Sequence, residues 1–321
     1  MAGKSPRILT CVLLCIVCLL ANVRKSAAQN ITGTILGTVR DPQGAVVPNA
    51  SVSAKNVGTG AERTVLTDAS GGFSIASVPA GSYDVTVLAS GFRTEVRSGI
   101  TMTVGAAVRV DFALNVGTVA EIVEVTSEAP QVETTNSTMS GLVAENIIRE
   151  LPLNGRDWLQ LAVLQPGVNP VLGSVPTGPA TKGLGAKISI SGGRTNQNVY
   201  RVDGLVVNDQ TNNSPGSALG VNMGVDAIRE FSVLTNTYSA EYGRSSGGVI
   251  NAITKSGTNT LHGTAFYFHR NSALDARNFF DISKPPFRRH QFGGSAGGEI
   301  KKDKLFFFSG YEGLRQFLSP T

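Results

Sequence analysis

Two neighbouring stretches decide how the first part of the chain folds: residues 68–75, Asp-Ala-Ser-Gly-Gly-Phe-Ser-Ile, and residues 78–85, Val-Pro-Ala-Gly-Ser-Tyr-Asp-Val. The glycine pair of the first stretch permits the positive φ of a tight hairpin, and the Pro-Ala-Gly of the second turns the chain again. After each turn, apolar and polar residues alternate, which is the period of a β-strand. The two stretches therefore predict short consecutive strands joined by tight turns.

Working outward, the same pattern of short strands and turns continues on both sides of these stretches. Further strands are predicted near residues 31–39, 52–56, 64–67, 93–97 and 108–114. About seven short strands with almost no helical period predict a two-sheet antiparallel β-sandwich over residues 29–115. The two quoted stretches resemble the carboxypeptidase regulatory-like domain, and the resemblance implies an accessory module without catalytic side chains.

Composition and charge exclude several classes of protein. The 321 residues are 41% hydrophobic and 16% charged, which argues against intrinsic disorder and against a charged coiled coil. The formal net charge is +5, but residues 1–28 hold four bases and no acid, so they contribute +4 of it. The basic balance therefore does not indicate a nucleic-acid partner.

Residues 1–28 have the pattern of an export signal. Lys4 and Arg7 precede an apolar run at residues 8–21, and Ser-Ala-Ala at 26–28 offers a cleavage site. The run of 14 residues is shorter than the ~20 that a membrane-spanning helix needs, although an uncleaved anchor and cleavage after Ala21 remain alternatives. All three cysteines lie in this run, which excludes disulfides and cysteine chemistry from the mature chain.

The polar and acidic segment 116–138 contains one apolar stretch, at residues 122–126. An isolated strand-forming stretch in a linker makes sense if it is offered to the sheet edge of a partner, where main-chain bonds give affinity. The alternatives are an ordinary linker strand or the first strand of the next domain.

Residues 139–255 combine short helices with strands, as an α/β domain does. Helical turns are predicted at residues 144–150 and 156–165, each ended by a proline, and a third near residues 225–229. Strands are predicted at residues 187–191, 199–202, 231–234 and 249–254.

This segment resembles the plug domain of TonB-dependent outer-membrane receptors. The resemblance rests on Ile-Ser-Ile-Ser-Gly-Gly-Arg at 188–194, Tyr-Arg-Val-Asp-Gly at 200–204, the run 228–243 and Ser-Gly-Gly-Val-Ile-Asn-Ala-Ile-Thr-Lys-Ser-Gly at 246–257. Leu-Pro-Leu-Asn-Gly-Arg at 151–156 is similar to the branch with an Oar-like barrel. The resemblance implies an energy-coupled transporter and a TonB box made of Glu121, Ile122, Val123, Glu124, Val125 and Thr126.

Eight residues of the plug motifs are candidates for a structural or functional role. Arg156 and Arg194 are candidates for ion pairs between plug and barrel wall, with solvated surface as the alternative. Asp203 and Gly204 predict a turn after a strand. The remaining candidates are small residues, of which the last two are expected to allow close backbone approach where the chain passes from plug to barrel: Gly192, Gly193, Gly247 and Gly248.

After residue 259 the period becomes strictly 2. Thr264, Phe266 and Phe268 lie on one side of a predicted strand, and we expect this face to point outward, toward lipid or missing strands. Residues 291–300 and 305–314 predict two further strands, and the long polar segment 271–288 an outer loop. A transporter barrel of ~22 strands of ~10 residues does not fit in the 66 residues after Lys255, so we expect about three strands and the front part of a longer receptor.

The sequence offers little support for catalysis. Gly-Arg-Ser-Ser-Gly at 243–247 matches the nucleophile-elbow pattern, but the elbow requires a following helix and a strand is predicted there. His262, His269 and His290 have no metal-ligand spacing. We therefore expect no enzyme, metal or cofactor, and a monomeric outer-membrane protein whose partners are TonB, lipid and an imported ligand of unknown class. The competing hypothesis is a secreted or surface adhesion protein built on the sandwich.

Overall fold

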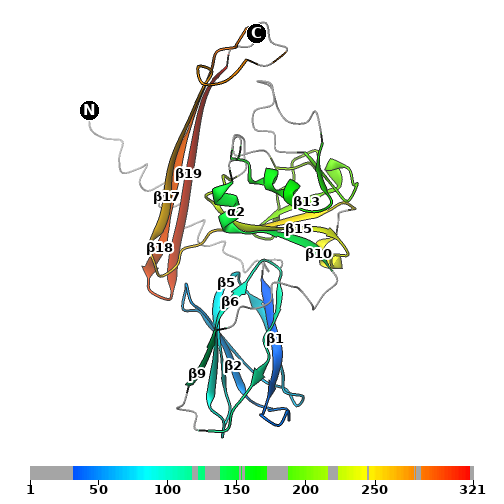
Figure 1. Cartoon of the computed structure of the whole chain (residues 1–321), viewed down its shortest axis with the longest axis vertical. Helices are drawn as coiled ribbons and strands as arrows, with labels where there is room; N and C mark the ends of the chain where they lie inside the picture. Colours follow the sequence, from blue (N-terminus) through cyan, green and yellow to red (C-terminus); the bar gives the residue numbers. More distant parts are fainter. Residues whose placement is uncertain are drawn as a thin grey trace, which may run out of the picture.

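The chain forms three successive β-rich parts, which Figure 1 shows from blue through green to red. The computed structural model describes residues 32–117, 122–126, 138–151, 153, 156–171, 187–215, 223–243, 246–277, 279 and 283–318. The predicted signal peptide at residues 1–28 and Glu121 lie outside the described residues. Among the described residues, no helix has the length and hydropathy to cross a bilayer.

The first part, called the sandwich below, has the two facing sheets that the sequence predicts. One sheet contains β4 (Gly72–Val78), β1 (Gly33–Arg40), β7 (Ala107–Arg109) and β8 (Phe112–Ala113). The other has the order β3 (Glu62–Leu66), β2 (Ser51–Asn56), β5 (Gly81–Leu88), β6 (Thr94–Met102) and β9 (Ile122–Thr126).

The sequence led us to expect an entirely antiparallel sandwich, but some of its strands pair in parallel. β1 pairs in parallel with β7 and with β8, and β6 pairs in parallel with β9. The chain leaves β6, crosses to the opposite sheet through β7 and β8, and returns to pair as β9, and such a crossover connects parallel strands.

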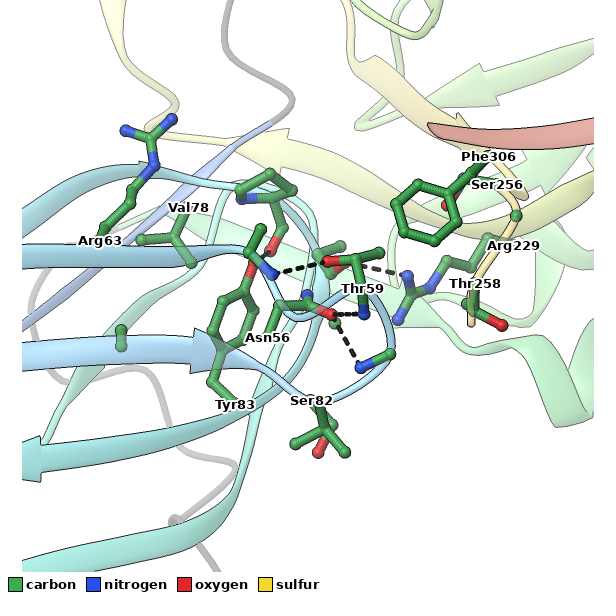
Figure 2. A pocket seen from close by; sticks show the side chains of 18 residues that line it. Asn56, Thr59, Arg63, Val78, Ser82, Tyr83, Arg229, Ser256, Thr258 and Phe306 are labelled. Carbon is green, nitrogen blue, oxygen red and sulfur yellow. Dashed lines mark hydrogen bonds between the residues drawn. The ribbon is translucent and has the colours of Figure 1, made fainter. Parts of the chain in front are cut away.

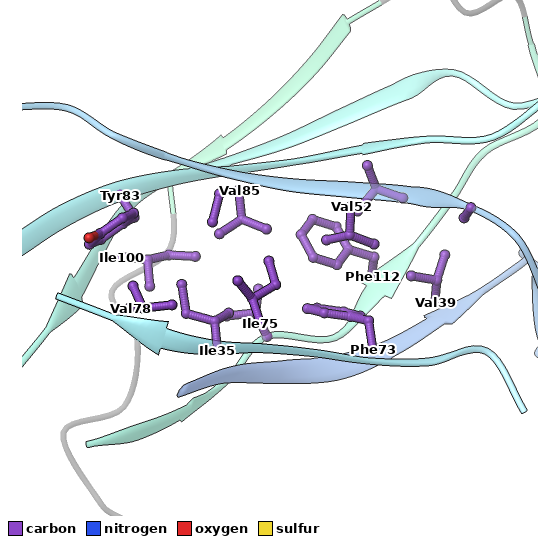
Figure 3. Close-up of a cluster of buried hydrophobic side chains, with 14 of the residues drawn as sticks. Ile35, Val39, Val52, Phe73, Ile75, Val78, Tyr83, Val85, Ile100 and Phe112 are labelled. Carbon is purple, nitrogen blue, oxygen red and sulfur yellow. The ribbon is translucent and has the colours of Figure 1, made fainter. Parts of the chain in front are cut away.

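A closed apolar core lies between the two sheets (Figure 3). Phe73 of β4 lies against Phe112 of β8 with ring centroids 6.2 Å apart, and Ile35 and Ile75 are almost fully buried beside them. These side chains occupy alternate positions along their strands, so the period-2 pattern of the sequence is the pattern of burial.

The turns within residues 68–72 and 78–83 hold the sandwich strands in register. Gly71 adopts φ +73°, and the Asp68 carboxylate accepts hydrogen bonds from the backbone N–H groups of Ser70 and Gly72. The Ser70 hydroxyl also donates to this carboxylate. The three hydrogen bonds lower the pKa of Asp68, and the one from the hydroxyl has the largest effect. In the second stretch the Tyr83 hydroxyl donates to the Pro79 carbonyl, 2.9 Å away.

The second part, called the plug below, is a five-stranded sheet with short helical segments on it. Its strand order is β10 (Met139–Val143), β15 (Ile228–Asn236), β16 (Val249–Thr254), β13 (Val199–Val202) and β14 (Leu205–Val206). β11 (Val168–Pro170) and β12 (Ile188–Ile190) form a separate pair. The helical segments are α2 (Glu145–Glu150) and the 3₁₀ helices η1 (Trp158–Leu164), η3 (Thr195–Gln197) and η4 (Ala240–Tyr242).

The plug core lies between its sheet and the first helical segments. Trp158 of η1 packs on Phe231 of β15 with ring centroids 4.9 Å apart, and Asp157 caps η1 by accepting from the Leu159 N–H. The predicted helix near residues 225–229 is wrong: a turn occupies residues 225–227, and β15 begins at Ile228, which pairs with Thr254 of β16. The local pattern is overridden here by the pairing with β16.

The third part is an antiparallel sheet of three long strands, as predicted. β17 (His262–Asn271), β18 (Phe287–Lys301) and β19 (Leu305–Leu318) pair in that order and stand beside the plug in Figure 1.

The predicted outward direction of Phe266 and Phe268 is wrong. The guanidinium of Arg156 in the plug lies 3.8 Å from the Phe266 ring centroid, and Thr264 on the same face donates to Asp226 of the plug. The opposite face, with Tyr267 62% exposed, points away from the plug, although Phe268 on the plug-facing side is itself 52% exposed. Alternation in sequence separates the two faces of a strand, but it does not say which one meets the plug.

We expect the sandwich to fold by itself, because its core belongs entirely to residues 35–114. In the isolated fragment 29–126, Phe73→Ala should lower the free energy of unfolding by about 3–5 kcal/mol, since it leaves a cavity between the sheets. Urea denaturation measures this loss. Leu66→Ala is the control, because Leu66 is 64% exposed and its loss should cost less than about 0.5 kcal/mol. Equal effects of both substitutions would contradict the core described here.

Candidate functional site

Two places in the structure carry candidate functional residues: the strand β9, and the contact between the plug and the three-stranded sheet. β9 contains five of the six residues of the predicted TonB box, Ile122 to Thr126. It pairs with β6 in parallel, with Ile122 opposite Thr94 and Thr126 opposite Ser98. The strand is therefore attached to the preceding domain, and it forms the last strand of that sheet.

Arg156 is the centre of the contact between the plug and the three-stranded sheet. It follows α2 in the loop before η1 and has a positive φ of +55°. Its guanidinium forms an ion pair with Asp226 of the plug, and its Nε lies 3.6 Å from a carboxylate oxygen of Glu312 on β19. All three side chains are only 14–15% exposed, so this small cluster is largely shielded from water.

Aromatic and polar groups of β17 and β18 complete the surroundings of Arg156. The guanidinium lies over the rings of Phe266 and Phe268, at 3.8 and 5.3 Å from their centroids, as in cation–π contacts. Asp226 also accepts a hydrogen bond of 2.9 Å from Thr264, and Glu312 accepts one from the amide of Gln291 on β18. The cluster thus connects the plug to all three strands of the sheet.

The charges in this cluster explain why it depends on Arg156. One guanidinium is the shared ion-pair partner of two carboxylates in a space from which water is largely excluded, and removal of one partner from a buried ion pair is costly. Gly224 makes the arrangement possible, because any side chain there would collide with the Glu312 carboxylate. Asp226, Glu312 and Gly224 were not among the sequence candidates, since they belong to no recognised motif.

Asp203 and Gly204 form the predicted turn and also bind a neighbouring strand. Their φ angles of +50° and +81° close a two-residue hairpin between β13 and β14. The Asp203 carboxylate accepts from the backbone N–H of Thr254 at 2.9 Å and from its hydroxyl at 2.7 Å. The motif residues therefore join the end of β13 to the end of β16.

Gly247 and Gly248 are buried in the plug, whereas Gly192 is exposed, and Gly247 and Gly248 do not lie where the sequence placed them. A Cβ on Gly247 would lie 2.6 Å from the Asn198 amide oxygen, and one on Gly248 would collide with Ile190. Gly192 adopts φ +77°, and Gly193 faces the backbone of Gly247. Gly247 and Gly248 do allow close approach, but between the start of β16 and the end of β12. They do not lie where the chain passes to the barrel strands.

Arg194 differs from Arg156 in its environment. It is exposed, and among the described residues it makes no ion pair. Its backbone N–H donates to the Gln197 side chain at 2.9 Å, which closes the first turn of η3. The position of Arg194 corresponds to the alternative of solvated surface.

A second contact, which the sequence did not indicate, joins the sandwich to the plug. The Val104 N–H donates to the Glu230 carboxylate at 2.7 Å, and Arg229 donates to the Ala80 carbonyl at 2.9 Å. The Asn259 N–H, in the segment that leads to β17, donates to the Gly58 carbonyl at 2.9 Å. The sandwich is therefore bound to the plug and to the start of the three-stranded sheet.

A cavity of about 580 Å³ lies at this junction (Figure 2). Asn56 and Tyr83 come from the sandwich, Arg229 from the plug, Thr258 from the segment before β17, and Phe306 from β19. Asn56 accepts hydrogen bonds from the N–H groups at positions 58 and 59, which orders the hairpin on the sandwich side. The cavity is thus a meeting point of all three parts.

Glu230 is the most buried acid at the junction, with 7% exposure. Burial raises its pKa, and Glu145 adds to this, while the Val104 N–H and Arg229 act in the opposite direction. A group whose pKa is raised in the folded state holds its proton more readily there than in the unfolded chain, so the contribution of Glu230 to stability is greatest at low pH.

The structure adds two observations on chemistry. Among the described residues, no three His, Cys, Asp or Glu side chains are grouped as metal ligands would be. The elbow-like run 243–247 is followed by the strand β16, where the nucleophile elbow requires a helix, although residues 244 and 245 lie outside the described part.

Comparison with known families and proteins accounts for all three parts. Residues 34–115 match the carboxypeptidase regulatory-like domain, residues 126–249 the TonB-dependent receptor plug domain, and residues 253–321 an outer membrane beta barrel domain. The chain is 30% identical over 303 residues to the TonB-dependent transporter Oar of Myxococcus xanthus, which covers 89% of the chain and 27% of that protein. The chain therefore spans about a quarter of the length of this curated relative.

Two solved structures are similar to part of the chain. The siderophore receptor PirA from Acinetobacter baumannii is 23% identical with a TM-score of 0.38, over 54% of this chain and 24% of that one. The outer membrane transporter YddB from Escherichia coli is 20% identical with a TM-score of 0.43, over 55% of this chain and 26% of that one.

We predict that Arg156→Ala loosens the plug from the three-stranded sheet, because it leaves Asp226 and Glu312 without a cation. The stability of this contact should fall by about 3 kcal/mol. Hydrogen exchange of the detergent-solubilised chain should then accelerate in β17 and around Gly224. Combining Arg156→Ala with Glu312→Gln should restore part of the loss, since one uncompensated charge is removed.

The control for this experiment is Arg194→Ala, which removes an exposed arginine and should change stability by less than about 0.5 kcal/mol. The role of Arg156 would be contradicted if both arginine variants exchanged like the unmodified chain.

We also predict that the contribution of Glu230 to the stability of the fold is lost as pH rises from the ordinary glutamate pKa of 4.5 through the raised value of Glu230. The measurement is the protection factor of the Val104 N–H, corrected for the pH dependence of intrinsic exchange. Glu230→Gln retains an acceptor for this N–H and should flatten the profile. An unaltered slope in the variant would show that another group is responsible.

Proposed function

The chain belongs to the TonB-dependent receptors, and from this we propose that it serves energy-coupled uptake of a ligand across the outer membrane. The observation that supports this best is the position of Arg156, which joins the plug to the inward face of three strands of the barrel family. A small buried ion cluster can hold a plug against a barrel wall at rest. Mechanical force on the plug can then break the cluster and release the plug.

The three-stranded sheet has the two faces that this function needs. Its inward face carries the partners of Arg156, and its outward face exposes large apolar and aromatic side chains: Leu305, Phe307, Tyr311 and Phe317. Side chains of this kind suit the lipid and the interface of a membrane. We propose that this face lies against outer-membrane lipid.

The position of β9 in the chain suits a TonB-binding segment. β9 ends at Thr126, and the plug begins with β10 at Met139, so force applied to β9 reaches the plug through β10 first. β10 is the edge strand of the plug sheet, and within the described part of the chain β15 is its one partner there. A pulling force would therefore break the residue pairs between β10 and β15 one after another. The pairs in the interior of the sheet would not have to break at the same time.

Two other functions receive less support. A secreted adhesion protein built on the sandwich is not favoured, because the plug and barrel families account for residues 126–249 and 253–321. The relative is a transporter, so we propose that the chain binds and moves a ligand without catalysing a reaction.

The experiment that tests the TonB contact is Val123→Pro. Proline removes a backbone donor in the middle of β9, so binding of the periplasmic domain of TonB to the detergent-solubilised chain should weaken by about tenfold or more. Isothermal titration gives the Kd. Thr134→Pro, in the same linker but outside the predicted box, should leave the Kd unchanged. If Val123→Pro bound like Thr134→Pro, the assignment of the box would be wrong.

A further inference from the structure

β9 is a sheet edge with one side occupied and one side open. Five residue pairs, from Thr94–Ile122 to Ser98–Thr126, join it in parallel to β6. Among the described residues, no strand pairs with its other side, and Figure 1 shows β9 at the margin of the sandwich. An unpaired edge of this kind presents a row of N–H and C=O groups that can template another strand.

The opposite end of the same sheet differs from β9. There, the edge strand β3 is tied across to the other sheet, because Arg63 donates to the Ala76 carbonyl of β4 at 3.2 Å.

The backbone of β9 can bond on both sides at once. Along a strand, successive N–H and C=O groups point to alternate sides, so the bonds to β6 use one set and leave the other. This is the ordinary situation of any interior strand of a sheet. Addition of a partner strand therefore does not require β9 to leave β6.

Charge indicates the kind of strand that fits. Residues 116–138 contain four acids and no base, and two of the acids flank or lie within β9: Glu121 and Glu124. A partner strand with lysine or arginine side chains complements this charge.

Order already present in β9 favours the same mode of binding. A free peptide loses the conformational entropy of every residue when it becomes a strand, whereas β9 is already extended and paired. The sandwich therefore lowers the entropic cost of strand addition.

We propose that the sandwich is part of the TonB-binding site: TonB adds a basic strand to the open edge of β9 while β9 stays paired with β6. This inference rests on the proposed function, and it assigns to the accessory domain the role of a platform that presents the box. The resulting sheet would continue from β3 to the TonB strand without interruption.

A disulfide between β6 and β9 tests whether β9 must leave. Val96 lies opposite Glu124, and neighbouring strands are about 4.8 Å apart, which a disulfide can span. The double variant Val96→Cys/Glu124→Cys is prepared without residues 1–28, which hold all the native cysteines, and is kept in detergent. The single variants carry the same substitutions without the bridge and serve as controls.

The probe is the purified periplasmic domain of TonB, titrated against the oxidised and the reduced double variant. We expect the two Kd values to agree within about twofold, because the open edge is unaffected by the bridge. We also expect a synthetic peptide of residues 118–130 to bind about tenfold more weakly than the chain, since it lacks the platform.

The outcomes separate the two levels of the proposal. Binding by the reduced form but not by the oxidised form would show that β9 must leave β6, and would overturn the platform alone. A peptide that binds as tightly as the chain would also overturn it. Absence of binding by the unmodified chain, both forms and the peptide would remove the TonB contact itself, and the platform with it.

Discussion

The charge of Arg156 is the constraint on which the arrangement of plug and barrel strands depends. A guanidinium that is 14% exposed needs nearby anions, and Asp226 and Glu312 supply them from two different parts of the chain. The Phe266 ring, 3.8 Å away, covers the flat face of the guanidinium. The plug is therefore held by a contact that is specific in geometry and small in extent, which suits the proposed function, in which the plug is retained and then moved.

The sandwich is bound to the rest of the molecule in a different manner. Its contacts include a bond from the Val104 N–H to the buried Glu230 carboxylate and one from the Arg229 guanidinium to the Ala80 carbonyl, and a cavity of about 580 Å³ remains between the parts. Polar interfaces of this kind are typical of domains that move relative to one another. The arrangement is consistent with a domain that follows the plug when force is applied, because β9 lies between the two in the chain.

The strand β9 relates these two contacts to the proposed function. It belongs to the sandwich by its pairing with β6 and precedes the plug by its place in the sequence. A partner that holds β9 therefore acts on both domains at once. The edge position of β10 gives such a force a defined place to enter the plug, while the Arg156 cluster resists it at the barrel wall.

Local pattern in the sequence determined what each segment is. The glycine turn at residue 71 and the alternation around Phe73 predicted the sandwich, Asp203 and Gly204 predicted a hairpin, and strict alternation after residue 260 predicted three long strands. These features depend on φ preferences and on the period of a strand, which neighbouring residues set by themselves.

Tertiary structure alone decided how the segments meet. Alternation could not tell which face of β17 meets the plug, and a helical pattern near Val225 yielded to pairing between Ile228 and Thr254. Asp226, Glu312 and Glu230 carry no motif, because a charge becomes important in this fold only through the distant residue that comes to lie beside it.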